Sequence, residues 1–202
     1  QNVNAQDGTE NMDIYLEKDI DISSIKDWTP IGNGTFSGTA VSGAAFKGTF
    51  HGQNHTIKGM NITVPADAAK GASYGLFGVL DGATVKDLDI GEGSSITSSA
   101  KLLTCGGAIA GSVVNSTVDH CTSSASFDIS GGTDNISQRF GGIAGSVYSA
   151  GEVIKVRGTI NLYKDTEQLK IDRIRHITEA DHVDMSSIVA SAPIEREKIF
   201  DS

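Results

Sequence analysis

The stretch Tyr74-Gly-Leu-Phe-Gly-Val-Leu-Asp-Gly-Ala-Thr-Val-Lys-Asp-Leu88 is repeated twice, in altered form, later in the chain. Each repeat places a short apolar piece between glycines, as in Gly107-Ala-Ile-Ala-Gly111 and Gly141-Gly-Ile-Ala-Gly145. The anchor glycines are 33 and 34 residues apart, at Gly78, Gly111 and Gly145. A fixed period in this range is typical of a solenoid, in which each unit buries its apolar face only against its neighbours.

A Val-x-x-apolar segment follows each glycine pair and predicts a short strand. These segments are Val85-Lys-Asp-Leu88, Val118-Asp-His-Cys121 and Val153-Ile-Lys-Val156. Strands this short are not stable alone, but stacked as rungs, each one turn of the coil, they would bury continuous ladders of Val, Ile and Leu. We therefore predict an all-β fold, a right-handed parallel β-helix-like solenoid of short Gly-rich rungs. A β-sandwich stays an alternative, because short strands and turns are common to both folds.

The same pattern extends upstream of the repeats. Residues 13–22 place Ile14, Leu16, Ile20 and Ile22 on one alternating face, which predicts a strand or a pair of strands. Residues 46–62 predict a strand, a tight turn and a second strand. Glycine also fits where a coil bends tightly. The glycines predicted to be structural in the repeats are Gly75, Gly78, Gly107, Gly111, Gly142 and Gly145.

The composition favours short strands with many turns and an acidic surface. Hydrophobic residues are 38 %, aromatic residues 6 %, and 24 residues are glycine. The net charge of −9 argues against broad binding of nucleic-acid phosphates by the whole chain. No run of apolar residues is long enough to cross a membrane. No basic-then-apolar leader is present, so we expect that an exported form would have lost its signal before Gln1.

The composition changes sharply near Gly151. Residues 1–151 hold 23 of the 24 glycines, whereas residues 152–202 hold four of the five arginines. Such a shift predicts a domain boundary. We therefore expect a frayed leader over 1–12, a solenoid over 13–151 and a different C-terminal unit over 152–202.

Three other residue types, cysteine, histidine and tryptophan, were weighed as candidate sites. Cys105 and Cys121 could form a disulfide in an oxidising compartment or could be two buried small side chains. His51 and His55 lack a third ligand nearby and are expected to be surface turn residues. Trp28 is expected to cover one end of the core, with stacking on a sugar as the alternative.

The upstream motifs resemble a known repeat family. Trp28-x-Pro-Ile-Gly32, then Phe46-x-Gly-Thr-Phe-x-Gly-x-x-His-Thr-Ile-x-Gly59, then Gly75-Leu-Phe-Gly78 are similar to GLUG-motif repeat proteins, over about residues 14–151. Those proteins are bacterial surface and adhesin-like modules. In the Asp-Gly-x-Gly-His-Thr pattern of the family, this chain has His51 and Asn54 in place of the Asp and the second Gly. The resemblance implies an exported surface protein with a binding or scaffolding role and no chemistry.

The C-terminal unit predicts a β-hairpin over 153–177 and a short helix starting near Ser191. Its pattern resembles the last strands and trailing helix of the OB fold in 3′–5′ exoribonucleases that carry an HD-type domain, although the first three OB strands and the His-Asp signature are missing. That resemblance implies single-stranded RNA binding through an aromatic side chain and cations. The positions carried over are Tyr163, Lys170, Arg173 and Arg175. The chain is therefore a fusion or composite of two units, or a solenoid whose last rung resembles an OB hairpin.

The sequence predicts no enzyme, cofactor or metal site. It lacks HExxH, GxSxG, the P-loop and a post-strand GxGxxG. A carbohydrate-active enzyme on a β-helix would need paired carboxylates in a cleft, and the candidates for that alternative are Asp19, Asp21, Asp87 and Asp89. We expect an extracellular or cell-surface, non-enzymatic module that binds a host protein or glycan, or acts as a scaffold; RNA binding by the C-terminal unit is the alternative.

Overall fold

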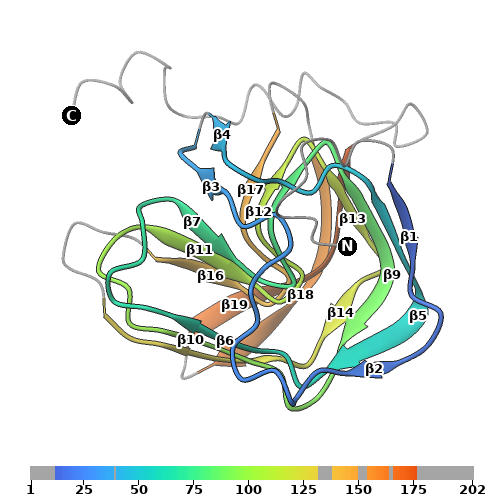
Figure 1. Cartoon of the computed structure of the whole chain (residues 1–202), viewed down its shortest axis with the longest axis horizontal. Helices are drawn as coiled ribbons and strands as arrows, with labels where there is room; N and C mark the ends of the chain where they lie inside the picture. The colour runs from blue at the N-terminus through green and yellow to red at the C-terminus, as the bar shows by residue number, and fades with distance from the viewer. Residues whose placement is uncertain (1–11, 39, 132–137, 150–153, 164–165, 177–202) are drawn as a thin grey trace.

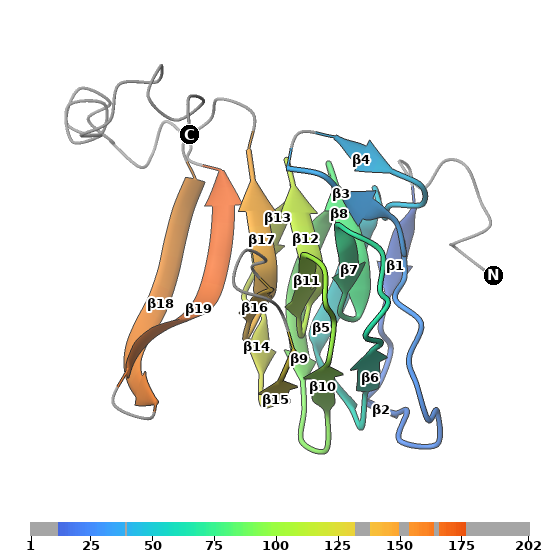
Figure 2. The same ribbon diagram turned by 90° about the vertical axis from the view of Figure 1, so that its left-hand side faces the viewer.

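The chain folds as an all-β solenoid of about four turns. The computed structural model describes residues 12–38, 40–131, 138–149, 154–163 and 166–176, and this part contains no helix. Figures 1 and 2 show strands of successive turns lying side by side. The solenoid strands pair in parallel, which confirms the predicted fold class and excludes the β-sandwich.

Four sheets run along the coil, numbered here in the order in which each turn visits them. Sheet 1 contains β1 (Asp13–Tyr15), β2 (Ile20–Asp21), β5 (Thr49–Lys58), β9 (Thr84–Ile90), β13 (Thr117–Asp119) and β14 (Thr122–Ser123). Sheet 2 contains β6 (Asn61–Val64), β10 (Ser95–Ser98) and β15 (Ser126–Ile129). Sheet 3 contains β7 (Ala72–Tyr74), β11 (Thr104–Gly107) and β16 (Arg139–Gly141), with β3 (Thr35–Phe36) and β4 (Val41–Ser42) at its edge. Sheet 4 contains β8 (Phe77–Asp81), β12 (Ala110–Val114) and β17 (Ala144–Tyr148).

The register stacks like residues on like in the interior. In sheet 1, Phe50 pairs with Val85 and Val85 with Val118, so the three apolar side chains form one ladder. A second ladder runs through Ile62, Ile96 and Phe127 of sheet 2. The predicted apolar face of residues 13–22 is confirmed, because its four side chains pack against the main core. Burying each large apolar side chain contributes about 1.5–3 kcal/mol, so the ladders are the main source of stability.

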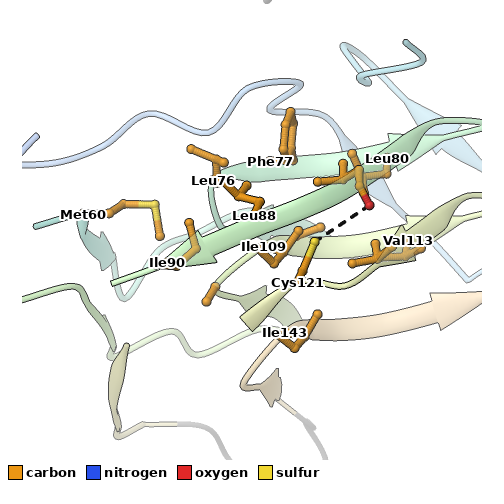
Figure 3. Packing of buried hydrophobic residues seen from close by; sticks show 14 of the residues in the cluster. Met60, Leu76, Phe77, Leu80, Leu88, Ile90, Ile109, Val113, Cys121 and Ile143 are labelled. Carbon is orange, nitrogen blue, oxygen red and sulfur yellow. Dashed lines mark hydrogen bonds between the residues drawn. The ribbon is translucent and has the colours of Figure 1, made fainter. Parts of the chain in front are cut away.

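Figure 3 shows part of this core around the thiol of Cys121. Cys121 donates a weak hydrogen bond to the carbonyl of Val85, 3.8 Å away, and burial raises the pKa of its thiol to about 12. Burial also raises the pKa of Cys105. Both cysteines are buried, and neither forms a disulfide. Of the two alternatives from the sequence, the structure has the buried small side chains and not the disulfide.

The anchor glycines let sheets 3 and 4 approach each other backbone to backbone. A Cβ on Gly111 would lie 2.3 Å from the backbone nitrogen of Tyr74, one turn earlier. A Cβ on Gly145 would lie 2.5 Å from the backbone nitrogen of Gly106, again one turn earlier. A side chain at either position would force the backbone to shift, because contacts below 3.0 Å to backbone atoms cannot be relieved by rotating a side chain.

One glycine prediction is corrected by the register. Gly107 pairs with Gly141 and not with Gly142. A Cβ on Gly141 would lie 2.3 Å from the carbonyl oxygen of Ala144, whereas a Cβ on Gly142 would meet no atom within 4 Å. Gly142 is therefore outside the column in which the sequence placed it, because the Gly-Gly pair left the choice of register open.

The predicted strand, turn and strand over residues 46–62 are present as β5, a turn at Gly59 and β6, but no turn interrupts the chain before Gly59. Residues 49–58 form the single strand β5, and its register shifts between His51 and His55. The extra residues Gln53 and Asn54 take left-handed φ values of 53° and 61°, so they form a bulge within the strand and not a hairpin turn. The turn comes at Gly59, with φ 72°.

The predicted C-terminal hairpin is present and extends sheet 1. β18 (Ile154–Tyr163) and β19 (Thr166–His176) pair antiparallel, and β19 pairs with β13 through Ile174 and Val118. Ile174 is only 1 % exposed, so the hairpin covers the last rung at this point. The predicted leader up to residue 11, the boundary near Gly151 and the helix near Ser191 lie outside the described residues.

We expect Gly111→Ala to destabilise the protein by about 1–3 kcal/mol, the usual cost of overpacking. The reason is that the added methyl group would collide with the backbone of β7. Gly142→Ala is the matched control, because its methyl group would point into open space, and its stability should change by less than about 1 kcal/mol. Urea unfolding of the two variants measures the difference, and equal destabilisation would contradict the backbone contact.

Candidate functional site

A pocket of about 410 Å³ lies where residues 27–33 run past the ends of sheets 2 and 3. It is bordered by β6 and β7, which are the first strands of the parallel stacks in those sheets. Its size is within the usual range for small-molecule sites. The lining residues are Asp27, Trp28, Thr29, Pro30, Asn33, Ile62, Thr63, Pro65, Ala72, Ser73 and Tyr74.

Trp28 is fixed in place by hydrogen bonds at both its backbone and its ring. Its backbone N–H donates to the carbonyl of Asn61 at 2.7 Å, and its indole Nε1 donates to the carbonyl of Leu76 at 3.2 Å. The half-buried ring also packs against the main core. The expectation that Trp28 covers one end of the core therefore agrees with its position, and the same ring lines the pocket.

Tyr74 is the second aromatic side chain of the pocket. It ends β7, is half-buried and packs against the same core. Burial raises the pKa of its phenol, and the negative charges of Asp27 and Asp67 raise it further. The phenol therefore stays protonated at neutral pH and can donate a hydrogen bond to a ligand.

Asp27 gives the pocket its charge. Its Oδ1 accepts a hydrogen bond from the backbone N–H of Thr63 at 2.9 Å, which orients the carboxylate and satisfies the edge of β6. The other polar groups on the lining belong to Thr29, Asn33 and Ser73. None of the lining residues is Lys, Arg or His. The pocket thus combines two aromatic rings, uncharged polar groups and one carboxylate.

Sequence reasoning identified Trp28 but missed Asp27 and Tyr74. These residues are far apart in the chain and meet only because the coil stacks one turn on the next. The signal was available in the period: counting 34 residues upstream from Ile62 gives Trp28. Extending the repeat upstream of its first recognisable glycine would have placed the segment around Trp28 beside the segment around Ile62.

The four positions carried over from the OB-fold resemblance lie in the hairpin and not at the pocket. Tyr163 ends β18, and Lys170, Arg173 and Arg175 belong to β19. The register sets Arg157 opposite Arg173 and Lys155 opposite Arg175. Arg175 is half-buried, and the side chains of the other three lie outside the described part.

The aspartates considered for catalysis lie on sheet 1, away from the pocket. Asp19 accepts hydrogen bonds from the backbone N–H of Thr56 at 2.9 Å and pairs with His55 at 3.0 Å. Asp89 accepts from the hydroxyls of Thr56 and Thr122, at 3.2 and 2.6 Å. Neither of these two carboxylates lines the pocket.

Other charged pairs also lie along sheet 1. Asp21 pairs with Lys58 at 3.4 Å, and Asp87 lies 3.9 Å from the ring of His120. His51 stacks on Tyr15 with ring centroids 4.2 Å apart. Within the described ranges no three His, Cys, Asp or Glu side chains are grouped to hold a metal ion.

Comparison of the chain with protein-family models, with curated proteins and with solved structures returns no match. The GLUG and OB-fold resemblances therefore stay predictions. In the part of the chain that the structure describes, no helix has the length and apolar character to cross a membrane.

We expect Asp19→Asn to lower the melting temperature above about pH 4, with the difference closing as the pH falls toward 2. The Thr56 N–H and then the His55 side chain, hydrogen-bonded to Asp19, hold its pKa below the ordinary value of 3.8. A lowered folded-state pKa gives stability that is present above the ordinary pKa and is lost as the pH falls through the folded-state pKa.

Thermal melts of both proteins at about pH 5, 3 and 2 measure this effect. Asp128→Asn, an exposed change on β15, serves as control and should leave the melting temperature unchanged. If the melting temperatures of the wild type and Asp19→Asn differed by the same amount at every pH, the stabilising role of the ionised Asp19 would be contradicted.

Proposed function

We propose that this chain is an exported, non-enzymatic binding module that holds a sugar unit of a glycan between Trp28 and Tyr74. The observation that carries the proposal is the pocket itself, with its two half-buried aromatic rings and its polar edge. The expected surface location and binding role rest on the resemblance of residues 14–151 to GLUG-motif proteins.

The chemistry of the pocket suits a pyranose ring. A pyranose has an apolar face of C–H groups and a rim of hydroxyls. The faces of Trp and Tyr cover apolar surface while their polar ends stay hydrogen-bonded. Asp27 and Asn33 can accept and donate hydrogen bonds to vicinal hydroxyls. The Trp28 backbone and ring are already fixed in the free protein, so little ordering of this side chain would oppose binding.

The solenoid supports a display role for this pocket. Each turn contacts only its neighbours, which gives a stiff rod without a catalytic centre. A stiff support keeps the pocket at a fixed distance from whatever anchors the other end, and this is the scaffolding part of the proposed role.

A titration of Trp28 emission tests sugar binding, because Trp28 is the single tryptophan of the chain. Methyl glucoside, galactoside and mannoside should be titrated in turn, and at least one should change the emission with a Kd on the order of 1 mM, typical of a single small sugar unit making a few contacts. Tyr74→Ala should weaken that binding about tenfold or more, since it removes one aromatic face.

Tyr15→Ala is the matched control for this titration. Tyr15 is 52 % exposed and lies on β1 of sheet 1, outside the pocket. Its loss should leave sugar affinity unchanged. The proposal fails if no sugar alters the emission, or if the Tyr15 and Tyr74 variants bind equally well.

A second candidate function, RNA binding by the hairpin, is supported by the register of β18 and β19. The backbone register pairs Lys155 with Arg175 and Arg157 with Arg173, so four basic residues occupy paired positions of the two strands. A concentration of basic residues on one strand pair is the composition that attracts a nucleic-acid backbone. β18 is the outer strand of sheet 1, so a single strand could reach it.

Single-stranded oligouridylate titrated at about 50 mM salt tests this second candidate. Arg173→Glu should weaken binding and reduce the slope of log K against log salt by about 1 for a cation in contact with phosphate. Lys101→Glu, at an exposed lysine outside the hairpin, should leave the slope unchanged. Absence of binding at the low salt concentration would exclude the hairpin as an RNA site.

A further inference from the structure

The charges around the Trp28–Tyr74 pocket restrict which sugars it can accept. The pocket carries the carboxylate of Asp27 and has no Lys, Arg or His among its lining residues. Asp67, in the loop after β6, acts on the same side: its charge and that of Asp27 both reach the phenol of Tyr74 and raise its pKa, after the larger effect of burial. A ligand at Tyr74 would experience both negative charges.

Cations close to these carboxylates in the sequence do not line the pocket. Lys26 and Lys70 are exposed, and neither side chain belongs to the lining. Asp27 is held against Thr63 by the 2.9 Å hydrogen bond, so its charge is fixed at the pocket and not spread over many rotamers.

Two of the lining groups favour a cation for a second, independent reason. The face of a Trp or Tyr ring attracts an ammonium group through its quadrupole. Trp28 and Tyr74 both line the pocket and can offer such rings to an ammonium group, and Asp27 supplies the counter-charge. An ammonium group bound here would exchange its water shell for contacts with two rings and a carboxylate. A uronic acid would instead place its own carboxylate next to that of Asp27, and the two negative charges would repel each other.

We infer that the pocket selects sugars that carry a free ammonium group, accepts neutral sugars more weakly and excludes uronic acids, with Asp27 as the residue that sets this order. This inference rests on the proposed sugar-binding function and adds the charge class of the ligand. It predicts amino sugars that lack an N-acetyl group as the preferred units, because acetylation removes the positive charge.

Three ligands of the same ring test the inference: methyl glucosaminide, methyl glucoside and methyl glucuronide, with the galacto series in parallel. They should be titrated against Trp28 emission at about pH 6, where the amine is protonated and the uronate ionised. The glucosaminide should bind about tenfold more tightly than the glucoside, and the glucuronide more weakly than both. Raising the salt concentration should reduce the differences in affinity among the three ligands, because salt screens the charge of Asp27.

Asp27→Asn keeps the size and the acceptor oxygen for Thr63 while it removes the charge. We expect the ratio of glucosaminide to glucoside affinity to fall from about ten to about two or below, the residual preference coming from the rings. Asp128→Asn removes an exposed charge on β15, two strands along sheet 2 from the pocket and outside its lining, and should leave the ratio at its wild-type value.

The outcomes separate the inference from the proposed function. Equal affinity for all three ligands, or tightest binding of the glucuronide, overturns the charge selection and leaves sugar binding in place. A ratio that survives Asp27→Asn shows that Asp27 does not set the order and overturns its assigned role. No emission change with any ligand of either series overturns the inference together with the sugar pocket.

Discussion

The contact between the backbones of sheets 3 and 4 constrains everything else in this solenoid. At Gly111 and Gly145 one turn touches the preceding turn without an intervening side chain. The coil therefore bends sharply at the same place in each turn, as the paths of β11 and β12 in Figure 1 show. This bend fixes the length of a turn, and the length of a turn sets the register that stacks Phe50, Val85 and Val118 into one ladder. The core depends on the glycines as much as on the apolar residues.

The pocket follows from how the stack begins. β6 and β7 are first in their parallel stacks; the segment around Trp28 crosses in front of them, and β3 adds one antiparallel pair to β7. A short segment satisfies the exposed edges through a few groups, the Asp27 carboxylate and the Trp28 backbone, but it does not fill the space that a full strand would fill. Aromatic rings and a carboxylate that serve as an edge cap are thereby left facing solvent, where they can serve binding.

Much of the architecture could be predicted from the chain, because the period is carried by glycines at which a side chain would force the backbone to shift. The apolar alternation of Ile14 and Ile20 likewise fixed a strand face. Which of Gly141 and Gly142 pairs with Gly107 could not be predicted. The two glycines are adjacent and chemically identical, and they differ only in the atoms that the fold places next to them. The bulge at Gln53 and Asn54 was missed because its left-handed residues resemble a turn. The pairing of Asp27 with Tyr74 was missed because it joins residues that only stacking brings together.

The position of the pocket also sets the valency of the molecule. A further 33- or 34-residue repeat added within the stack would pair with its neighbours through the same columns and leave β6 and β7 first in line. Such a protein would be longer, yet each chain would still carry one pocket of this kind. Reach and avidity would then be controlled separately: repeat number extends the rod, while tighter attachment to a multivalent surface requires several chains side by side.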